Sequence, residues 1–152
     1  MIPPSQLVAH AADLARTAHA GQLDKAGFPY AAHPERVARS VAGDALAEAV
    51  AWLHDVVEDT QTTLDDLREA GFPERVVAAV DALTRRPSEL PDAYYARVAR
   101  DPLATRVKRA DLDDNSDPIR LRELDEPTRT RLQEKYAHAR EVLDRWESAP
   151  GD

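Results

Sequence analysis

Residues 52–60 place one histidine and three carboxylic acids close together in the chain. At ~100° per residue of an α-helix, four ionisable side chains share one half of the helix: His54, Asp55, Glu58 and Asp59. A solvated helix face usually mixes lysine and arginine with acids, whereas this one has neither. Like charges held so close cost free energy unless a cation or a proton relieves them. The stretch therefore indicates a metal site or an acid–base site.

The adjacent pair His54-Asp55 offers an imidazole nitrogen and a carboxylate oxygen that diverge from one helical turn yet can reach the same ion. This mixture of ligands favours Mn²⁺, Fe²⁺ or Zn²⁺ over Ca²⁺. A His-Asp pair by itself is common in proteins, so further ligands have to come from other parts of the chain.

Two such ligands can be proposed from their positions. His33 stands at a predicted loop-to-helix junction, from which its imidazole can point inward. Asp111 falls on the apolar face of a predicted helix, where an unpaired carboxylate would be costly. On the same helix, Asp113 falls on the solvated side, and Asp114 is kept as a reserve ligand.

The elements that must position these residues are all helical. Apolar residues recur with helical spacing, proline and glycine separate the segments, and no segment alternates as a strand does. The sequence predicts an all-α fold of about eight helices, over residues 5–20, 33–41, 45–59, 63–70, 73–84, 91–100, 102–115 and 127–146. It also predicts loops over 21–32 and 85–90 and a polar connection that begins at 117–118.

Composition limits the classes of protein that the chain can belong to. Its 152 residues, 43% of them hydrophobic, suit a single domain over 1–152. The absence of cysteine excludes disulfides and Cys-bound zinc. No apolar run is long enough to span a membrane, and the start shows no signal peptide. We therefore expect a cytoplasmic protein without membrane association, and its oligomeric state is left open.

The formal net charge of −8 argues against nucleic-acid binding, which normally needs a basic surface. A polyanionic small molecule is still possible as a substrate. It would have to be met by a metal ion or by local lysine and arginine side chains that overcome the overall field.

Five blocks of sequence resemble the HD-domain hydrolases of the RelA/SpoT type, and most closely the small alarmone hydrolases related to the metazoan SpoT homolog. The blocks occur in the family's order over about two thirds of the chain. They are His-Ala-Gly-Gln at 19–22, Lys-Ala-Gly with Pro-Tyr at 25–30, His-Pro at 33–34, Leu-His-Asp-Val-Val-Glu-Asp-Thr at 53–60 and Val-Lys-x-Ala-Asp with Asn at 107–115.

The resemblance implies a helical HD fold and removal of the 3′-pyrophosphate from ppGpp or pppGpp, which gives GDP or GTP. It implies one Mn²⁺, or another divalent transition metal, with four ligands: His33, His54, Asp55 and Asp111. Glu58 and Asp59 would position and deprotonate the attacking water or protonate the leaving oxygen. Asn115 would contact the nucleotide near its ribose, Lys25 would meet its phosphates, and Lys108 could assist there.

The chain departs from the family pattern beside two of these residues. Asp24 precedes Lys25 where many members have a basic residue that packs on guanine, and Pro118 lies where longer members have a hydroxyl or a basic group. Alternative substrates are therefore an adenine counterpart such as pppApp, or the 2′-phosphate of NADPH. A non-catalytic HD module that binds a nucleotide is the other alternative.

Overall fold

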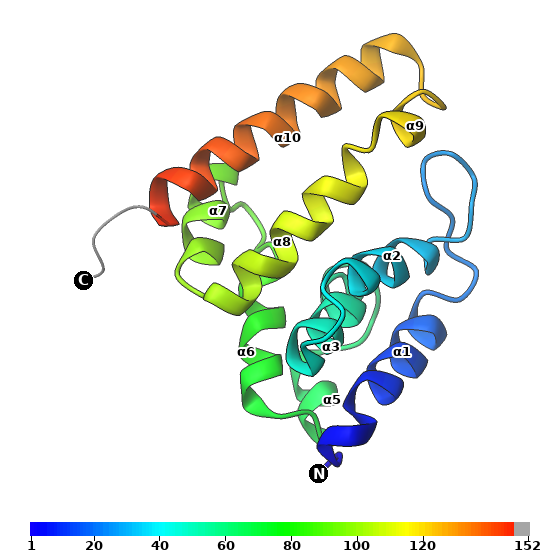
Figure 1. Ribbon diagram of the computed structural model, residues 1–152, viewed down its shortest axis with the longest axis vertical. Coiled ribbons are helices and arrows are strands. Elements are labelled where there is room, and N and C mark those ends of the chain that lie inside the picture. Colours follow the sequence, from blue (N-terminus) through cyan, green and yellow to red (C-terminus); the bar gives the residue numbers. More distant parts are fainter. Residues whose placement is uncertain (148–152) are drawn as a thin grey trace.

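The computed structural model describes residues 1–147 and confirms the predicted all-α class. No strand forms in this part of the chain, where one isolated β-bridge joins Leu23 and Pro29. The last five residues of the predicted domain 1–152 lie outside the described residues. A 3₁₀ turn (Pro4–Gln6) is followed by α1 (Leu7–Ala18), α2 (Ala32–Ser40), α3 (Ala45–Leu53), α4 (Val56–Asp59), α5 (Leu64–Glu69), α6 (Glu74–Leu83), α7 (Pro91–Ala99), α8 (Pro102–Asn115), α9 (Pro118–Leu121) and α10 (Glu126–Glu147). All of these helices except the short α4 are labelled in Figure 1.

The helix α3 is the centre of the fold. It packs against α1, α2, α6 and α8, and all of its residues from Ala49 to Leu53 are buried. A helix segment that is apolar on all sides is stable when other helices surround it. The chain leaves α3 at His54, which is 2% exposed, so the fold delivers this imidazole directly into the interior.

The predicted helix over 45–59 is wrong in one respect, because it is interrupted at His54 and Asp55. The Nδ1 atom of His54 lies 2.6 Å from the carbonyl oxygen of Ala51. In an uninterrupted helix that carbonyl would accept the Asp55 N–H. The side chain competes for this acceptor, and the helical phases of the sequence analysis do not hold beyond Leu53.

The helix α8 begins with a side-chain cap. The Asp101 carboxylate accepts hydrogen bonds from the backbone N–H groups of Leu103 and Ala104, at 2.9 and 3.1 Å, and Pro102 occupies the first turn. The buried face of α8 packs on α2, α3, α6, α7 and α10. One turn before its end this face carries Asp111, which is 4% exposed, as its helical phase predicted.

Two irregular segments meet at one end of the molecule, as Figure 1 shows: the loop between α1 and α2, and α9. In the loop, Asp24 Oδ1 accepts from the N–H groups of Ala26 and Phe28, both at 2.9 Å, and Gly27 adopts a φ of 89°. The helix α9 is a single turn within the predicted polar connection, and the Asp117 side chain caps it through the Ile119 N–H.

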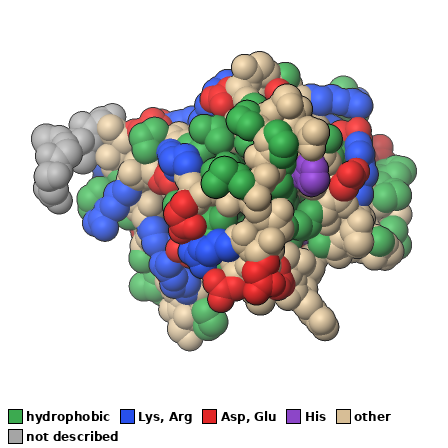
Figure 2. Space-filling view, turned by 90° about the horizontal axis from the view of Figure 1, so that it is seen from below, with side chains coloured by type: hydrophobic (Ala, Val, Ile, Leu, Met, Phe, Trp, Pro, Cys, Tyr) green, Lys and Arg blue, Asp and Glu red, His purple; other side chains and the backbone are tan. Residues whose placement is uncertain are grey.

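The surface is strongly charged but mixed in sign. On the face shown in Figure 2, basic side chains lie among acidic ones. Several ion pairs join separate elements, among them Arg106–Asp44 and Arg75–Asp101, each at 2.8 Å. Within residues 1–147, no helix combines the length and the hydrophobicity needed to cross a lipid bilayer.

The cap of α8 gives a first prediction. Asp101→Ala should lower the free energy of unfolding by about 1 kcal/mol, within the 0.5–2 kcal/mol of a lost N-cap, as measured by urea denaturation. Asp101→Asn is the matched control, because it loses the charge opposite Arg75 and keeps the cap. Equal losses in both variants would show that the ion pair, and not the cap, stabilises this end of α8.

Candidate metal centre

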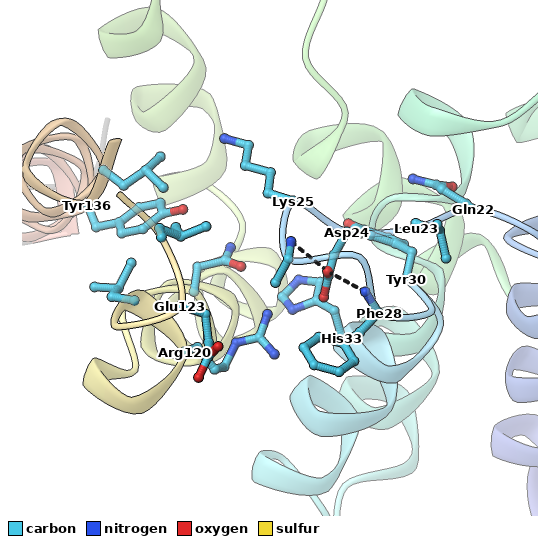
Figure 3. A pocket seen from close by; sticks show the side chains of 15 residues that line it. Gln22, Leu23, Asp24, Lys25, Phe28, Tyr30, His33, Arg120, Glu123 and Tyr136 are labelled. Atoms are coloured by element: carbon cyan, nitrogen blue, oxygen red, sulfur yellow. Dashed lines mark hydrogen bonds between the residues drawn. The ribbon is translucent and has the colours of Figure 1, made fainter. Parts of the chain in front are cut away.

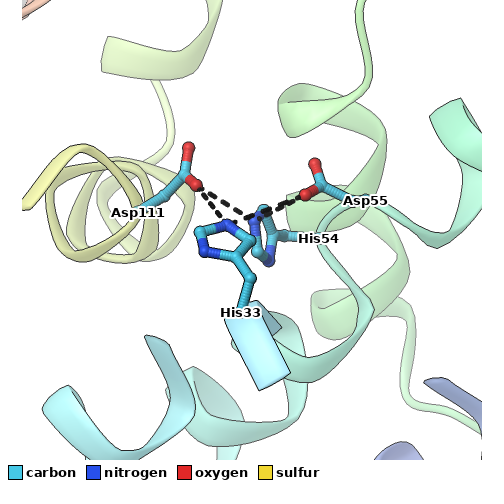
Figure 4. A group of neighbouring side chains, drawn as sticks. All are labelled: His33, His54, Asp55 and Asp111. Carbon is cyan, nitrogen blue, oxygen red and sulfur yellow. Dashed lines mark hydrogen bonds and ion pairs between the residues drawn. The ribbon is translucent and has the colours of Figure 1, made fainter. Parts of the chain in front are cut away.

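Four side chains from three separate parts of the chain converge at the middle of the bundle: His33, His54, Asp55 and Asp111. Each offers one ligand atom, and these atoms all lie within 4.8 Å of one another (Figure 4). The Nε2 atom of His33 lies 2.8 Å from Asp111 Oδ1 and 3.9 Å from Asp55 Oδ2. The Nε2 atom of His54 lies 3.1 Å from Asp55 Oδ2 and 3.3 Å from Asp111 Oδ1.

The outward-facing nitrogens of the two histidines have acceptors of their own. Nδ1 of His33 lies 2.7 Å from Asp114 Oδ2, and Nδ1 of His54 lies 2.6 Å from the Ala51 carbonyl oxygen. These partners assign the proton of each neutral imidazole to Nδ1, which leaves a lone pair on Nε2. Both lone pairs then face the carboxylates, as they do in metal sites with hydrogen-bonded histidine ligands.

This arrangement fits a divalent metal ion. His54 Nε2 is fully buried and has no hydrogen-bond partner among the described residues. Imidazole lone pairs and carboxylate oxygens that face one another repel unless a cation or a proton lies between them. Burial lowers the pKa of His54, but Asp55 and Asp111 raise it well above its usual value overall. Two nitrogens and two oxygens match the first-row transition metals better than Ca²⁺.

A second layer of side chains holds the two carboxylates. The Tyr30 hydroxyl donates to Asp55 Oδ2, and burial, followed by the Asp55 charge, raises the pKa of Tyr30, so this donor keeps its proton. Lys108 Nζ lies 2.9 Å from Asp111 Oδ2, and Asn115 Nδ2 donates to Asp111 Oδ1 at 3.0 Å. Burial works to raise the pKa of Asp111, but Lys108 and the two histidines hold it well below its usual range.

Two residues have places here that the sequence analysis did not assign. Asp114, the reserve ligand, lies behind His33 and not in the central cluster, and it also accepts from Arg36 Nε at 2.8 Å. Tyr30 belonged to a matched motif but was given no role. Its only signal in the sequence was that motif, because the distance between residues 30 and 55 conceals their contact.

The acidic pair Glu58 and Asp59 lies one turn beyond Asp55, on α4, and both side chains are exposed. Glu58 Oε1 accepts the backbone N–H of Arg85 at 2.8 Å, which ties α4 to the loop between α6 and α7. Burial, then the charges of Asp55 and Glu58, raise the pKa of Asp59 to about 6. A carboxyl group of this kind can hold a proton close to neutral pH.

A cavity of about 270 Å³ opens beside the cluster, between the loop that follows α1 and the α9–α10 segment (Figure 3). His33 forms part of its wall, so the cavity adjoins the four converging side chains. Of the three predicted substrate contacts, Lys25 and Asn115 line this cavity. Lys108 does not; its ammonium group is directed at Asp111 and lies 5.4 Å from the centre of the Tyr94 ring.

Positive charge is concentrated near this site despite the net charge of −8. The chain has three lysines, and two of them, Lys25 and Lys108, lie within electrostatic reach of the third, Lys135. Burial comes first in lowering the pKa of Lys135, on α10, and the charges of Arg85, Lys108 and Lys25 lower it further. Within residues 1–147, Lys25, Arg85 and Lys135 form no ion pair with an acid. This is the local cationic field that a polyanionic ligand requires.

Comparison with known proteins gives consistent results. A profile of the HD domain matches residues 11–101. A probable guanosine-3′,5′-bis(diphosphate) 3′-pyrophosphohydrolase from Synechocystis is 40% identical over 85 residues, which are 54% of this chain and 11% of the relative. A guanosine-3′,5′-bis(diphosphate) 3′-pyrophosphohydrolase from Aquifex aeolicus is 34% identical over 119 residues, 71% of this chain and 17% of the relative. The chain thus spans less than a fifth of the length of these relatives.

A solved structure of a metazoan ortholog of SpoT, described as hydrolysing ppGpp, has the same fold. The TM-score is 0.75 and the sequence identity 23%, over 97% of this chain and 89% of that one. The agreement over nearly the whole of both chains shows that the helical arrangement is shared.

The geometry predicts different effects on metal binding for Asp111, a candidate ligand, and for Asp114, which only supports the ligand His33. Asp111→Ala should abolish metal binding, because it removes a carboxylate that faces both imidazoles. Asp114→Ala should weaken binding about 10–100-fold, as expected for the loss of a partner behind a histidine ligand. Equilibrium dialysis with elemental analysis measures both. Undiminished metal binding by Asp111→Ala would rule out the proposed ligand set.

Proposed function

The chain belongs to the HD-domain family, and from this premise we propose that it is a metal-dependent (p)ppGpp 3′-pyrophosphohydrolase. The reaction adds water across the bond between the ribose 3′-oxygen and its pyrophosphate. ppGpp gives GDP and pyrophosphate, and pppGpp gives GTP and pyrophosphate. The names of relatives that match over half of this chain or more support this substrate class.

One observation carries the proposal: two imidazoles and two carboxylates, buried except for the partly exposed Asp55, converge beside both an acidic pair and a cavity with cations around it. We infer that the four converging side chains hold Mn²⁺. When bound, such an ion offsets the charge that develops on phosphoryl oxygens and acidifies water. The two carboxylates and two nitrogens suit Mn²⁺, and geometry alone leaves Fe²⁺ and Zn²⁺ as competitors.

The acidic pair moves the protons in this proposal. Glu58 and Asp59 lie one turn beyond Asp55, near enough to the cluster to act on a water molecule there without being ligands. The pair takes a proton from the attacking water and returns one to the leaving 3′-oxygen. The hydrogen bond from the Arg85 N–H holds Glu58 in place, and two adjacent carboxyl groups of this kind titrate as a coupled pair.

The cations bind the substrate's phosphates. Lys25 lines the cavity, and Lys135 and Arg85 add positive charge that no acid in the described part of the chain neutralises. Asn115, on the cavity wall, contacts the nucleotide near its ribose. Lys108 supports the site in another way than the one predicted, because it acts through Asp111 and holds that carboxylate ionised.

A nucleotide panel tests the proposal. The purified protein is incubated with Mn²⁺ and with ppGpp, pppGpp, pppApp or NADPH, and the products are separated by chromatography. We expect GDP and pyrophosphate from ppGpp and loss of the activity in EDTA. Release of orthophosphate from NADPH without turnover of ppGpp would replace the proposed substrate. Tight nucleotide binding with no turnover of any compound would instead identify a binding module.

The role of the acidic pair gives a separate prediction. Glu58→Gln should retain the metal and lower kcat about 10²–10⁴-fold, which is the usual contribution of a general acid or base. The matched control is Glu69→Gln, an equally exposed glutamate at the end of α5. A Glu58→Gln enzyme that works at nearly the parent rate would exclude this residue from proton transfer.

The cationic field predicts an effect on affinity. Lys135→Gln should raise KM for ppGpp severalfold and change kcat much less, because the lysine is placed to attract phosphate and not to take part in bond breaking. The effect should shrink as salt screens the charges. Arg145→Gln, on the last turns of the same helix, controls for the loss of one positive charge. An equal rise in KM in both variants would argue against a local role for Lys135.

A further inference from the structure

We propose that Arg120, on α9, and Glu123, on the turn after it, recognise the guanine base of the substrate. This inference rests on the proposed function and adds the residues that would select the base. It concerns the far wall of the cavity, opposite the loop that contains Lys25 (Figure 3).

The cavity has largely apolar walls, against which a planar base can pack. Apolar side chains line it from both sides: Leu23, Ala26 and Phe28 from the loop, and Leu121, Leu124 and Leu132 from the α9–α10 segment. Tyr136 adds an aromatic ring. Small-molecule sites commonly combine such apolar walls with a few polar groups that set orientation and specificity. The polar groups that line this cavity therefore decide which base it accepts.

On the loop between α1 and α2, the residue before Lys25 is Asp24, and its charge is not available to the base. Asp24 uses one carboxylate oxygen to accept two backbone N–H groups, those of Ala26 and Phe28. The Asp24 side chain stabilises the loop conformation through these two hydrogen bonds. Position 24 therefore has no cation that could pack on a purine. The charged groups that remain for the base lie on the opposite wall, on α9 and just after it.

The Arg120 side chain lines the cavity and is 31% exposed. In the part of the chain that the structure describes, its guanidinium group makes no hydrogen bond, and its Nε is buried without one. Its nearest carboxylate oxygen, Asp114 Oδ2, lies 3.9 Å away. Asp114 already has closer donors in His33 and Arg36, at 2.7 and 2.8 Å. Two arginines thus share one carboxylate, and the surplus positive charge is on the cavity wall.

Glu123 provides the complementary acceptor. The Glu123 N–H donates to the carbonyl oxygen of Arg120 at 3.2 Å, so the two residues belong to one turn and both line the cavity. Their side chains nevertheless form no ion pair with each other among the interactions within residues 1–147. Among the described residues, this wall therefore presents an arginine with one long ion pair and no hydrogen bond, and on the same turn a glutamate without an ion pair.

This pair matches guanine and mismatches adenine. Guanine presents the acceptors N7 and O6, to which arginine can donate two hydrogen bonds. The donors N1–H and N2–H₂ follow along the same side of the ring, and a carboxylate can accept from both. Adenine has an amino donor in place of O6 and an acceptor at N1. In an adenine complex, Arg120 would face a donor and Glu123 would face an acceptor.

The test compares two substrates that differ only in the base, ppGpp and ppApp. The ratio of their kcat/KM values is measured with Mn²⁺ for the parent, Arg120→Gln and Glu123→Gln. Arg122→Gln is the matched control, because Arg122 lies between the two residues, is exposed and does not line the cavity. Metal content and thermal unfolding of each variant report whether the fold and the metal centre are intact.

We expect the parent to prefer ppGpp, and each cavity variant to lose about tenfold or more of that preference, as when one good bidentate contact to a base is removed. The loss should appear in KM for ppGpp. The control should keep the parent's ratio. An unchanged ratio in both Arg120→Gln and Glu123→Gln would overturn the inference.

A binding measurement separates this inference from the proposed function. Affinities for GDP and ADP are measured by calorimetry on the metal-loaded parent and on the same variants. If the parent hydrolyses none of the substrates but prefers GDP, and Arg120→Gln abolishes that preference, the proposed function fails and the guanine site stands. If the parent hydrolyses ppGpp yet binds GDP and ADP equally, the function stands and the guanine site fails.

Discussion

The structure depends on one electrostatic constraint: two carboxylates and two imidazoles meet at one point, and all of them except the partly exposed Asp55 are buried. Asp111 and His54 are almost fully inaccessible to water, and charged or unpaired groups in such a place are costly. A cation resolves the conflict, since it attracts the lone pairs and the carboxylate oxygens together. The surrounding helices position the four side chains at this point. The helix α3 brings His54 and Asp55, α2 brings His33, and α8 brings Asp111.

The second layer makes the cluster rigid and sets its charge. Asp114 and the Ala51 carbonyl orient the two imidazoles. Tyr30 donates to Asp55 Oδ2, the oxygen that faces the imidazoles, and Lys108 contacts the outer oxygen of Asp111. Such partners fix the tautomer and orientation of ligands before a metal arrives. The interruption between α3 and α4 belongs to the same design. The His54 imidazole donates to the Ala51 carbonyl oxygen, and the helix is interrupted at this point. Because the chain turns here, the neighbouring side chains of His54 and Asp55 can face the same point.

Much of the fold and of the metal centre could be predicted from residue types and helical phase. The remaining features could not, and the reason can be named for each. The apolar face of α8 predicted that Asp111 would be buried, and proline and glycine predicted where most helices are separated. The break at His54 could not be predicted, because it arises from a side chain competing with the backbone for a single acceptor. The contact between Tyr30 and Asp55 and the place of Asp114 behind His33 depend on tertiary packing. A pattern along one helix contains no information about either. The single turn of α9 was missed because four residues carry no helical periodicity.

The distribution of charge explains how an acidic protein can receive a polyanion. Most arginines of the described chain pair with acids, many of them on the surface, for example Arg106 with Asp44 at 2.8 Å, and the charges cancel there. The three lysines do not follow this pattern. Lys108 forms an ion pair with Asp111 inside the site. Lys25 and Lys135 form no ion pair within residues 1–147 and lie near the cavity. Arginine forms planar, two-point contacts and suits fixed ion pairs, while a lysine ammonium is a mobile point charge. A flexible phosphate chain can be held by such point charges in several positions. In the proposed complex, a rigid base needs directed contacts such as those of a guanidinium and a carboxylate, so the two kinds of cation would divide the recognition of one substrate between them.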